Sequence, residues 1–223
     1  MVAILVILTI VVAVAVDALV VANRRRAGAT APHPARGMAQ PRPPQGVFLD
    51  ASHSWARITS DGSLRVGVDE FLTEALGEVD RVGVPGRGTQ VKRGEALLHL
   101  QVKGREIIVP SPASGEVMTV NSQVVEKPWL VARDPYGVGW AVALWTRDLQ
   151  EAIRPLRIGA SVAGFLRQEM MRLADFLSAS SLRRAEAPLL ADGGMPRHGA
   201  VMDLDDAGLA AFQDEFLRPG REG

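Results

Sequence analysis

The strongest constraint on the fold lies between Ala96 and Val109, where two runs of β-prone residues flank the dipeptide Lys103-Gly104. Glycine adopts positive φ without steric cost, so a tight hairpin turn is expected at this dipeptide. Gly94-Glu95 precedes the first run and Pro110–Ser114 follows the second, and both stretches are typical of turns. The sequence therefore predicts a β-hairpin with Lys103 at or beside its tip.

The region around this hairpin, residues 47–147, is predicted to be mainly β. Short apolar runs alternate there with turn signals such as Asp61-Gly62 and Pro85-Gly86. Asp69–Leu76 is the exception, because acids at its start and Gly77 after its end predict a short helix. Many short strands at this spacing indicate a pair of sheets or a barrel. The expected strands are Ala56–Ile58, Leu64–Val68, Val79–Val84, Ala96–Val102, Glu106–Val109, Val117–Val120 and Trp140–Leu144.

The spacing of apolar residues changes after residue 147 and predicts a helical extension at residues 148–178. Apolar residues recur there at helical spacing, and Pro155 and Gly159 are expected to divide the run into two helices. Helices that pack on their own sheet explain this pattern, and a partner-docking stripe of Met170, Met171 and Phe176 is the alternative.

The remaining residues, 179–223, are predicted to form a loop followed by a short amphipathic helix. The helix is expected at Asp203–Leu217, with Asp203 as its N-terminal cap and Pro219-Gly220 after its end. Its few apolar residues cannot build a core alone, so the segment either folds back onto the domain or binds a partner. We name Phe212 and Phe216 as candidate partner contacts.

At the N-terminus, Met1–Ala22 is almost wholly apolar and is followed by Arg24, Arg25 and Arg26. Twenty-two helical residues span about 33 Å, enough for a hydrocarbon layer of about 30 Å. A signal peptide is the competing interpretation, but the segment lacks a basic start. We therefore predict a single transmembrane helix at residues 1–23. The positive-inside rule then leaves the N-terminus outside and the main domain in the cytoplasm.

Residues 24–46 are rich in proline, alanine and glycine, which predicts an extended tether between membrane and domain. Asp17 is the only ionisable residue of the apolar run. It either faces the lipid interface near the three arginines or contacts a neighbouring transmembrane helix. Asp17 and the arginines are thus candidate contacts with the bilayer or a partner.

Composition excludes several functions. The formal net charge is zero, so no bulk field attracts nucleic acid. The absence of cysteine excludes disulfides and thiolate catalysis. The four histidines, His33, His53, His99 and His198, have no metal-ligand spacing, and His53 beside Trp55 is interpreted as structural. The spacing of the histidines predicts no metal site. The sequence also shows no recognisable set of acid, base and nucleophile, so we expect no catalytic residues.

Several motifs in residues 53–145 occur together in one order. They are His53-Ser54-Trp55, Gly67-Val68-Asp69 with Ala75-Leu76-Gly77, Val91–Glu95, Ser111–Val117, Asn121, Leu130-Val131 and Asp134–Trp140. This set, somewhat under half of the chain, resembles the H protein of the glycine cleavage system, a lipoyl carrier. The resemblance implies a mainly β (α+β) fold, a lipoyl-type flattened β-barrel with flanking helices.

The carrier site departs from that family. The family pattern is Glu-Ser-Val-Lys-Ala, with the lipoyl lysine seven residues before the serine of Ser-Pro-x-Ser-Gly. Seven residues before Ser111 stands Gly104, and Lys103 lies one residue earlier, without the preceding acid. A shift of one residue along a strand turns a side chain to the opposite face. An inserted turn residue is the alternative that would absorb the shift.

Two functions follow from these patterns. The first is a non-catalytic, membrane-anchored interaction subunit of a larger membrane complex, respiratory or photosynthetic, without a cofactor. Its partners would be other subunits and the lipid bilayer, not nucleic acid. The second is a membrane-tethered lipoyl carrier with covalent lipoate on Lys103. The sequence departure at the carrier site favours the first function.

Overall fold

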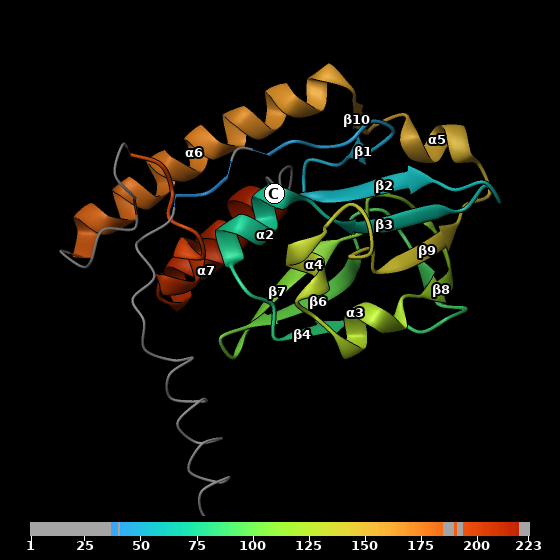
Figure 1. Cartoon of the computed structure of the whole chain (residues 1–223), viewed down its shortest axis with the longest axis horizontal. Helices are drawn as coiled ribbons and strands as arrows, with labels where there is room; N and C mark the ends of the chain where they lie inside the picture. Colours follow the sequence, from blue (N-terminus) through green and yellow to red (C-terminus); the bar gives the residue numbers. More distant parts are fainter. Residues whose placement is uncertain (1–36, 40, 185–189, 191–193, 219–223) are drawn as a thin grey trace, which may run out of the picture. The chain divides into compact units, whose positions relative to one another are not determined.

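The computed structural model describes residues 37–39, 41–184, 190 and 194–218 (Figure 1). The predicted membrane anchor and the first part of the predicted tether lie outside these residues. Within the described ranges, no helix is long and apolar enough to cross a membrane.

Within the described residues, the strands form two antiparallel sheets. The larger has seven strands in the order β10-β1-β2-β3-β9-β8-β5, and the smaller has three in the order β4-β6-β7. The mainly β architecture with flanking helices is therefore confirmed. The strands are β1 (Phe48–Leu49), β2 (Ser54–Ile58), β3 (Leu64–Val68), β4 (Arg81–Gly83), β5 (Gln90–Val91), β6 (Ala96–Val102), β7 (Arg105–Pro110), β8 (Gly115–Val120), β9 (Val142–Trp145) and β10 (Arg157–Ile158).

The predicted hairpin is confirmed as the β6–β7 pair. Its register runs from Ala96 opposite Pro110 to Val102 opposite Arg105, with an irregularity between Ala96 and Leu98. Leu98, Leu100 and Val102 of β6 are buried at alternate positions, as are Ile107 and Val109 of β7, because alternate residues of a strand face the same side. The hairpin is thereby fixed on the core while its turn projects from it.

Helix α2 (Glu70–Leu76) lies where the short helix was predicted, and local chemistry explains both of its ends. The Asp69 side chain accepts a hydrogen bond from the Leu72 N–H at 2.8 Å, which satisfies one unpaired donor of the first turn. Gly77 follows with φ of 83°, a positive value that glycine adopts at little cost and that ends the helix.

Two short helices, α3 (Ser122–Glu126) and α4 (Leu130–Arg133), precede the last long strand. Beyond it, α5 (Leu149–Ile153) and α6 (Ala160–Arg184) are separated at Pro155 and Gly159, as predicted. Helix α6 continues past residue 178, where a loop was expected to begin. Leu166, Leu173 and Leu177 of α6 are buried against the domain.

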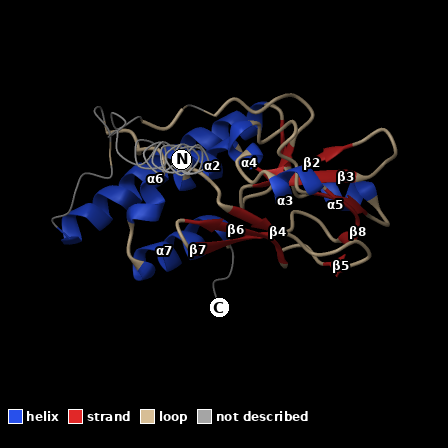
Figure 2. Cartoon of the chain, turned by 60° about the horizontal axis from the view of Figure 1, so that its bottom comes forward, coloured by secondary structure: helices blue, strands red, loops and turns tan. Residues whose placement is uncertain are grey.

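The last described residues form the 3-10 helix η1 (Ala200–Asp203), the helix α7 (Asp206–Phe212) and the π-helical turn η2 (Gln213–Leu217). The predicted cap residue differs from the observed one. Asp203 ends η1, and Asp205 caps α7 by accepting from the Gly208 N–H at 2.7 Å. The chain turns between the two aspartates, which a search for cap residues alone does not detect. Figures 1 and 2 both show α7 beside the hairpin strands.

The end of the predicted tether lies against the domain. Met38 is buried, and its main-chain N–H donates to the carbonyl of Pro196 at 2.8 Å. The Arg42 N–H donates to Glu70 Oε2 at 2.7 Å, at the start of α2. Met38 thus contributes a large apolar side chain to the core at this point.

Candidate functional site

The turn of the β6–β7 hairpin consists of Lys103 and Gly104, because Val102 and Arg105 are the last paired residues. Both turn residues have positive φ, 50° for Lys103 and 76° for Gly104. Positive φ at both central positions is typical of a type I′ turn, whose twist matches that of the flanking strands. This conformation costs a residue with a Cβ atom on the order of 1–2 kcal/mol, so the fold imposes it on Lys103.

The Lys103 side chain lies at the surface and pairs with one carboxylate, while the main-chain N–H of Lys103 bonds to a second. The side chain is 61% exposed, and its Nζ lies 2.9 Å from Oδ1 of Asp203. Its main-chain N–H donates to Oδ2 of Asp80 at 2.6 Å. Asp80 stands directly before β4, whereas Asp203 is a hundred positions further along the chain. The amine is therefore accessible but already paired.

Residues 200–217, which we call the C-terminal segment, make further contacts with the same hairpin. Arg105 donates to the carbonyl of Leu204 at 2.5 Å and forms an ion pair with Asp206 at 3.0 Å. The Gln213 amide accepts from the Ile108 N–H at 3.1 Å and donates to the carbonyl of Glu106 at 3.4 Å. The amide thus takes the place of a neighbouring strand along β7, which is an edge strand of its sheet.

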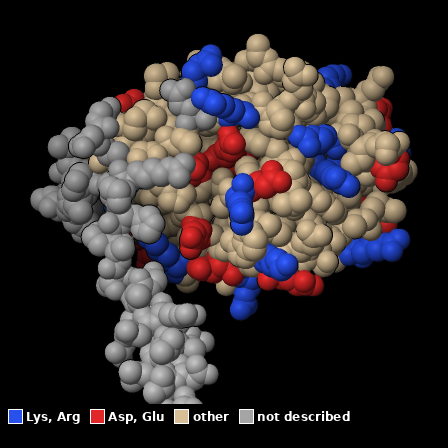
Figure 3. All heavy atoms as spheres, viewed as in Figure 1, with Lys and Arg blue, Asp and Glu red and all other residues tan. Residues whose placement is uncertain are grey.

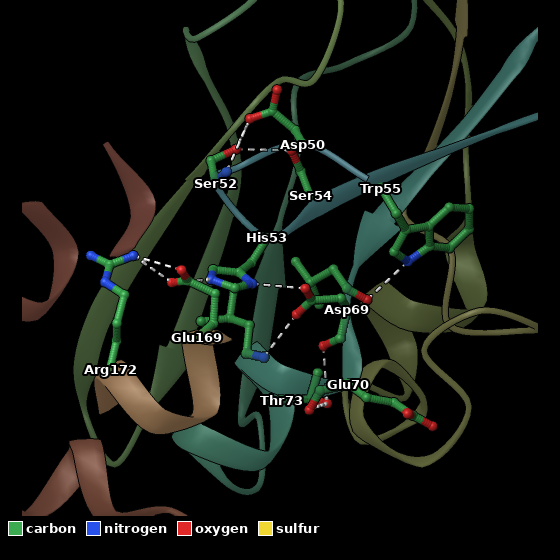
Figure 4. A network of polar contacts seen from close by, with 12 residues as sticks. Asp50, Ser52, His53, Ser54, Trp55, Asp69, Glu70, Thr73, Glu169 and Arg172 are labelled. Carbon is green, nitrogen blue, oxygen red and sulfur yellow. Dashed lines mark hydrogen bonds and ion pairs between the residues drawn. The ribbon is translucent and has the colours of Figure 1, made fainter. Parts of the chain in front are cut away.

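A second cluster of charged side chains is buried where the loop before β2 meets α2 and α6 (Figure 4). His53 is 0% exposed, and its Nδ1 lies 2.7 Å from Oδ2 of Asp69. Its Nε2 lies 3.6 Å from Oε2 of Glu169 on α6. The imidazole stacks on Phe71 at a ring-centre distance of 4.2 Å. Asp69 therefore caps α2 with one oxygen and holds His53 with the other.

The charges of this cluster stabilise one another. Burial alone would lower the pKa of His53, but the charge and hydrogen bond of Asp69, together with the nearby charge of Glu169, outweigh burial and raise that pKa to about 9. Burial would raise the pKa of Glu169, but the nearby His53 charge and the hydrogen bonds from Arg172 hold that pKa below its usual range. At neutral pH, His53 is therefore an imidazolium and Glu169 a carboxylate.

Arg172 extends the cluster to the C-terminal segment. Its guanidinium donates to both oxygens of Glu169, at 2.6 and 2.8 Å, and pairs with Glu215 at 3.4 Å. The guanidinium also lies over the ring of Phe216, 4.9 Å from its centre. Polar contacts thus run from the buried histidine through α6 to the segment that covers the hairpin.

Phe212 and Phe216, named from the sequence as candidate partner contacts, lie in the core of the chain. They are 0% and 1% exposed and stack on each other at 5.0 Å. Phe216 also packs on Phe71 at 6.0 Å, and Phe176 contacts both phenylalanines. The segment therefore folds back onto the domain, the first of the two alternatives. Burial against α2 and α6 removes these side chains from the surface.

The other predicted site residues are distributed differently. Lys103 lies in the hairpin turn, whereas Asp17, Arg24, Arg25 and Arg26 lie outside the described residues. The buried ion cluster was not predicted from the sequence. Its one detectable signal was Glu169, an acid on the helix face that also carries Leu166 and Leu173.

Comparisons with known proteins agree with this description. The family model described as Glycine cleavage H-protein matches residues 47–168. The chain is 31% identical over 123 residues to a probable glycine cleavage system H protein of Pyrococcus abyssi, covering 55% of this chain and 91% of that protein. It is 40% identical over 98 residues to the glycine cleavage system H protein of Marinobacter nauticus, covering 44% and 75%.

A crystal structure of a glycine cleavage system H protein from Mycobacterium marinum is also similar, with 31% identity and a TM-score of 0.49. The match covers 55% of this chain and 97% of that one. Because the family model covers more than half of the residues and the hairpin lies within it, the chain belongs to the glycine cleavage H-protein family.

Proposed function

We propose that this protein is a non-catalytic carrier in which Lys103 holds a lipoyl group through an amide bond. The observation that carries the proposal is the position of Lys103, a 61% exposed lysine in the two-residue turn of the hairpin. The relatives named above support it, since they are H proteins. The chain would present the group to partner enzymes and would not transform it.

The geometry of the turn removes the main objection from the sequence. The family position of the lysine falls on Gly104, and a shift of one residue inside a strand would point Lys103 to the other face. Lys103 and Gly104, however, are the two central residues of one turn, with no strand pairing between them. The shift therefore moves the amine along the tip of the hairpin and keeps it outside the sheet.

The residues around Lys103 fit an attached lipoyl group. The amine reaches solvent, and apart from Asp203 no described side chain pairs with it. A lipoyl group would supply a disulfide on a flexible arm. The chain's own contribution is to hold the lysine backbone rigidly, through the Asp80 hydrogen bond and the fixed turn.

The apolar sequence Met1–Ala22 supports the further proposal that the carrier is tethered to the cytoplasmic membrane, with the described domain on the cytoplasmic side. Its partners would be the bilayer and enzymes that exchange the carried group. Acidic and basic side chains are interspersed on the face shown in Figure 3, which gives nucleic acid no basic patch there.

A structural subunit without a cofactor is the second candidate, and one observation favours it. The C-terminal segment pairs Asp203 with Lys103 and covers the edge of β7, which gives the hairpin an internal role. In that function Lys103 would stay unmodified, and the protein would organise a membrane complex.

Intact mass separates the two functions. The full chain is purified in mild detergent from its native membranes, alongside the variants Lys103→Arg and Lys92→Arg. A carrier gains the mass of one lipoyl group in the natural chain and in Lys92→Arg, and loses it in Lys103→Arg. Lys92 is the matched control because it is an exposed lysine in the turn before β6. An unmodified natural chain from cells whose other lipoyl proteins carry the group would exclude the carrier function.

A further inference from the structure

The C-terminal segment lies outside residues 47–168, the part that matches the family. It contacts the hairpin at the turn through Asp203, at the start of β7 through Leu204 and Asp206, and further along β7 through Gln213. The contact at the turn involves the amine that the proposed function requires. A segment added to the family domain is thus positioned to affect that amine.

We propose that the C-terminal segment regulates the acylation of Lys103. Asp203 holds the ammonium group of Lys103 on the segment, and acylation removes the charge and loosens the segment from the hairpin turn. This inference rests on the proposed carrier function.

Asp203 is well placed for this role because its own position is fixed. The preceding residues of η1, Ala200, Val201 and Met202, are all buried. Its second oxygen pairs with Arg197. A carboxylate that is already oriented loses little conformational freedom when it binds an amine, which strengthens an exposed ion pair.

The chemistry of acylation explains why the ion pair must open. The Lys103 ammonium must leave Asp203 and lose a proton, so that the nitrogen lone pair can attack the carbonyl carbon of an activated acyl donor, a mixed anhydride. An N–C bond forms, and the bond from the carbonyl to its leaving group breaks with its electron pair. The nitrogen then releases a second proton to solvent. The neutral amide that results cannot form an ion pair with Asp203.

Coupling of this kind is reciprocal. If Asp203 stabilises the charged amine relative to the neutral amide, then loss of the lysine charge must weaken the attachment of the segment by the same equilibrium factor, and the acylation rate shares the direction of this effect. An exposed ion pair accounts for a factor of about two to five. Each direction can be measured separately.

The first experiment needs no acylation. Hydrogen exchange of residues 200–217 is compared in full-length Lys103→Arg, which keeps the positive charge, and Lys103→Gln, which removes it. We expect exchange about two- to fivefold faster in the glutamine variant, with unchanged exchange in β2 and β3. Equal exchange of the segment in the two variants would overturn the regulatory role.

The second experiment measures the rate at which a lipoate ligase with its activated donor acylates the full chain. Asp203→Asn should raise the rate about two- to fivefold. Asp214→Asn is the control, because it removes an equal charge from the same segment where Asp214 pairs with Arg218, 3.2 Å away. Equal rates in all three proteins would overturn the regulation alone. No acylation in any of them would overturn the carrier function as well.

Discussion

Replacing Glu169 by glutamine removes one negative charge from the buried cluster and keeps the shape of the side chain. In the natural chain, Glu169 faces Nε2 of His53, and both of its carboxylate oxygens accept hydrogen bonds from the Arg172 guanidinium. The variant leaves the imidazolium with Asp69 as its only carboxylate. We expect a lower free energy of unfolding that also depends less strongly on pH.

The magnitude follows from the burial of these groups. Removal of one partner from a buried ion pair costs about 3–5 kcal/mol, because it leaves the other charge uncompensated. Asp69 still compensates His53, and the contact between Nε2 and Glu169 is long at 3.6 Å. We therefore expect Glu169→Gln to lower the free energy of unfolding by about 3 kcal/mol, the lower end of that range.

The pH dependence has a definite sign. The pKa of His53 rises from 6.5 to about 9 on folding, so the folded state holds the proton more tightly. The resulting stability is present in full below about pH 6.5 and is lost as pH rises through 9. A shift of this size corresponds to roughly 3 kcal/mol. Glu169→Gln should lower the folded pKa of His53 and flatten this decline.

Denaturant unfolding of the full chain in mild detergent, at pH 6.5 and at pH 9, tests both expectations. Glu151→Gln is the matched control, because Glu151 forms an exposed pair with Arg154 at 3.5 Å on α5. The control should change the free energy of unfolding by less than about 0.5 kcal/mol. If Glu169→Gln behaves like the control at both pH values, the buried histidine is not held as a cation by this cluster and the reasoning fails.

Two further substitutions test close packing in the domain, one beside α4 and one in the C-terminal segment. Gly139→Ala should destabilise the fold by about 1–3 kcal/mol, since a Cβ atom there would lie 2.6 Å from the carbonyl oxygen of Asp134 and 2.7 Å from that of Leu130. Thermal unfolding measures the loss of stability. Gly86→Ala is the control, because a Cβ atom at Gly86 would have no neighbour within 4 Å. Phe212→Ala should cost about 3–5 kcal/mol and accelerate hydrogen exchange across the C-terminal segment. A small effect of Phe212→Ala would contradict the aromatic packing described above, and a small effect of Gly139→Ala would contradict the close approach of Gly139 to Asp134 and Leu130.

Local sequence signals predicted the elements that position the hairpin. The Lys103-Gly104 dipeptide between two β-prone runs predicts a tight turn because Gly104 adopts positive φ at little cost. Helix α2 is predicted equally well, since Asp69 and Gly77 supply its cap and its end. In both cases the deciding interactions involve residues close together in sequence.

The ion cluster and the cover on the hairpin could not be predicted in this way. His53 and Glu169 meet only because α6 folds across the loop before β2, and Lys103 meets Asp203 across a hundred positions. A helical pattern indicates which face of a helix is apolar but not which element it covers. Glu169 on such a face indicates a buried partner without identifying it.

The boundary of the family match also has a physical meaning. The match ends at residue 168, and Glu169, the next residue, is a counter-ion of the buried His53 inside the matched domain. Arg172 then joins Glu169 to Glu215, and Phe216 packs on Phe71 of α2. Residues beyond the match therefore complete the electrostatics and the core of the H-protein domain. The C-terminal segment that carries Glu215 and Phe216 also carries Asp203, which pairs with Lys103, so one segment contacts both the buried cluster and the hairpin turn.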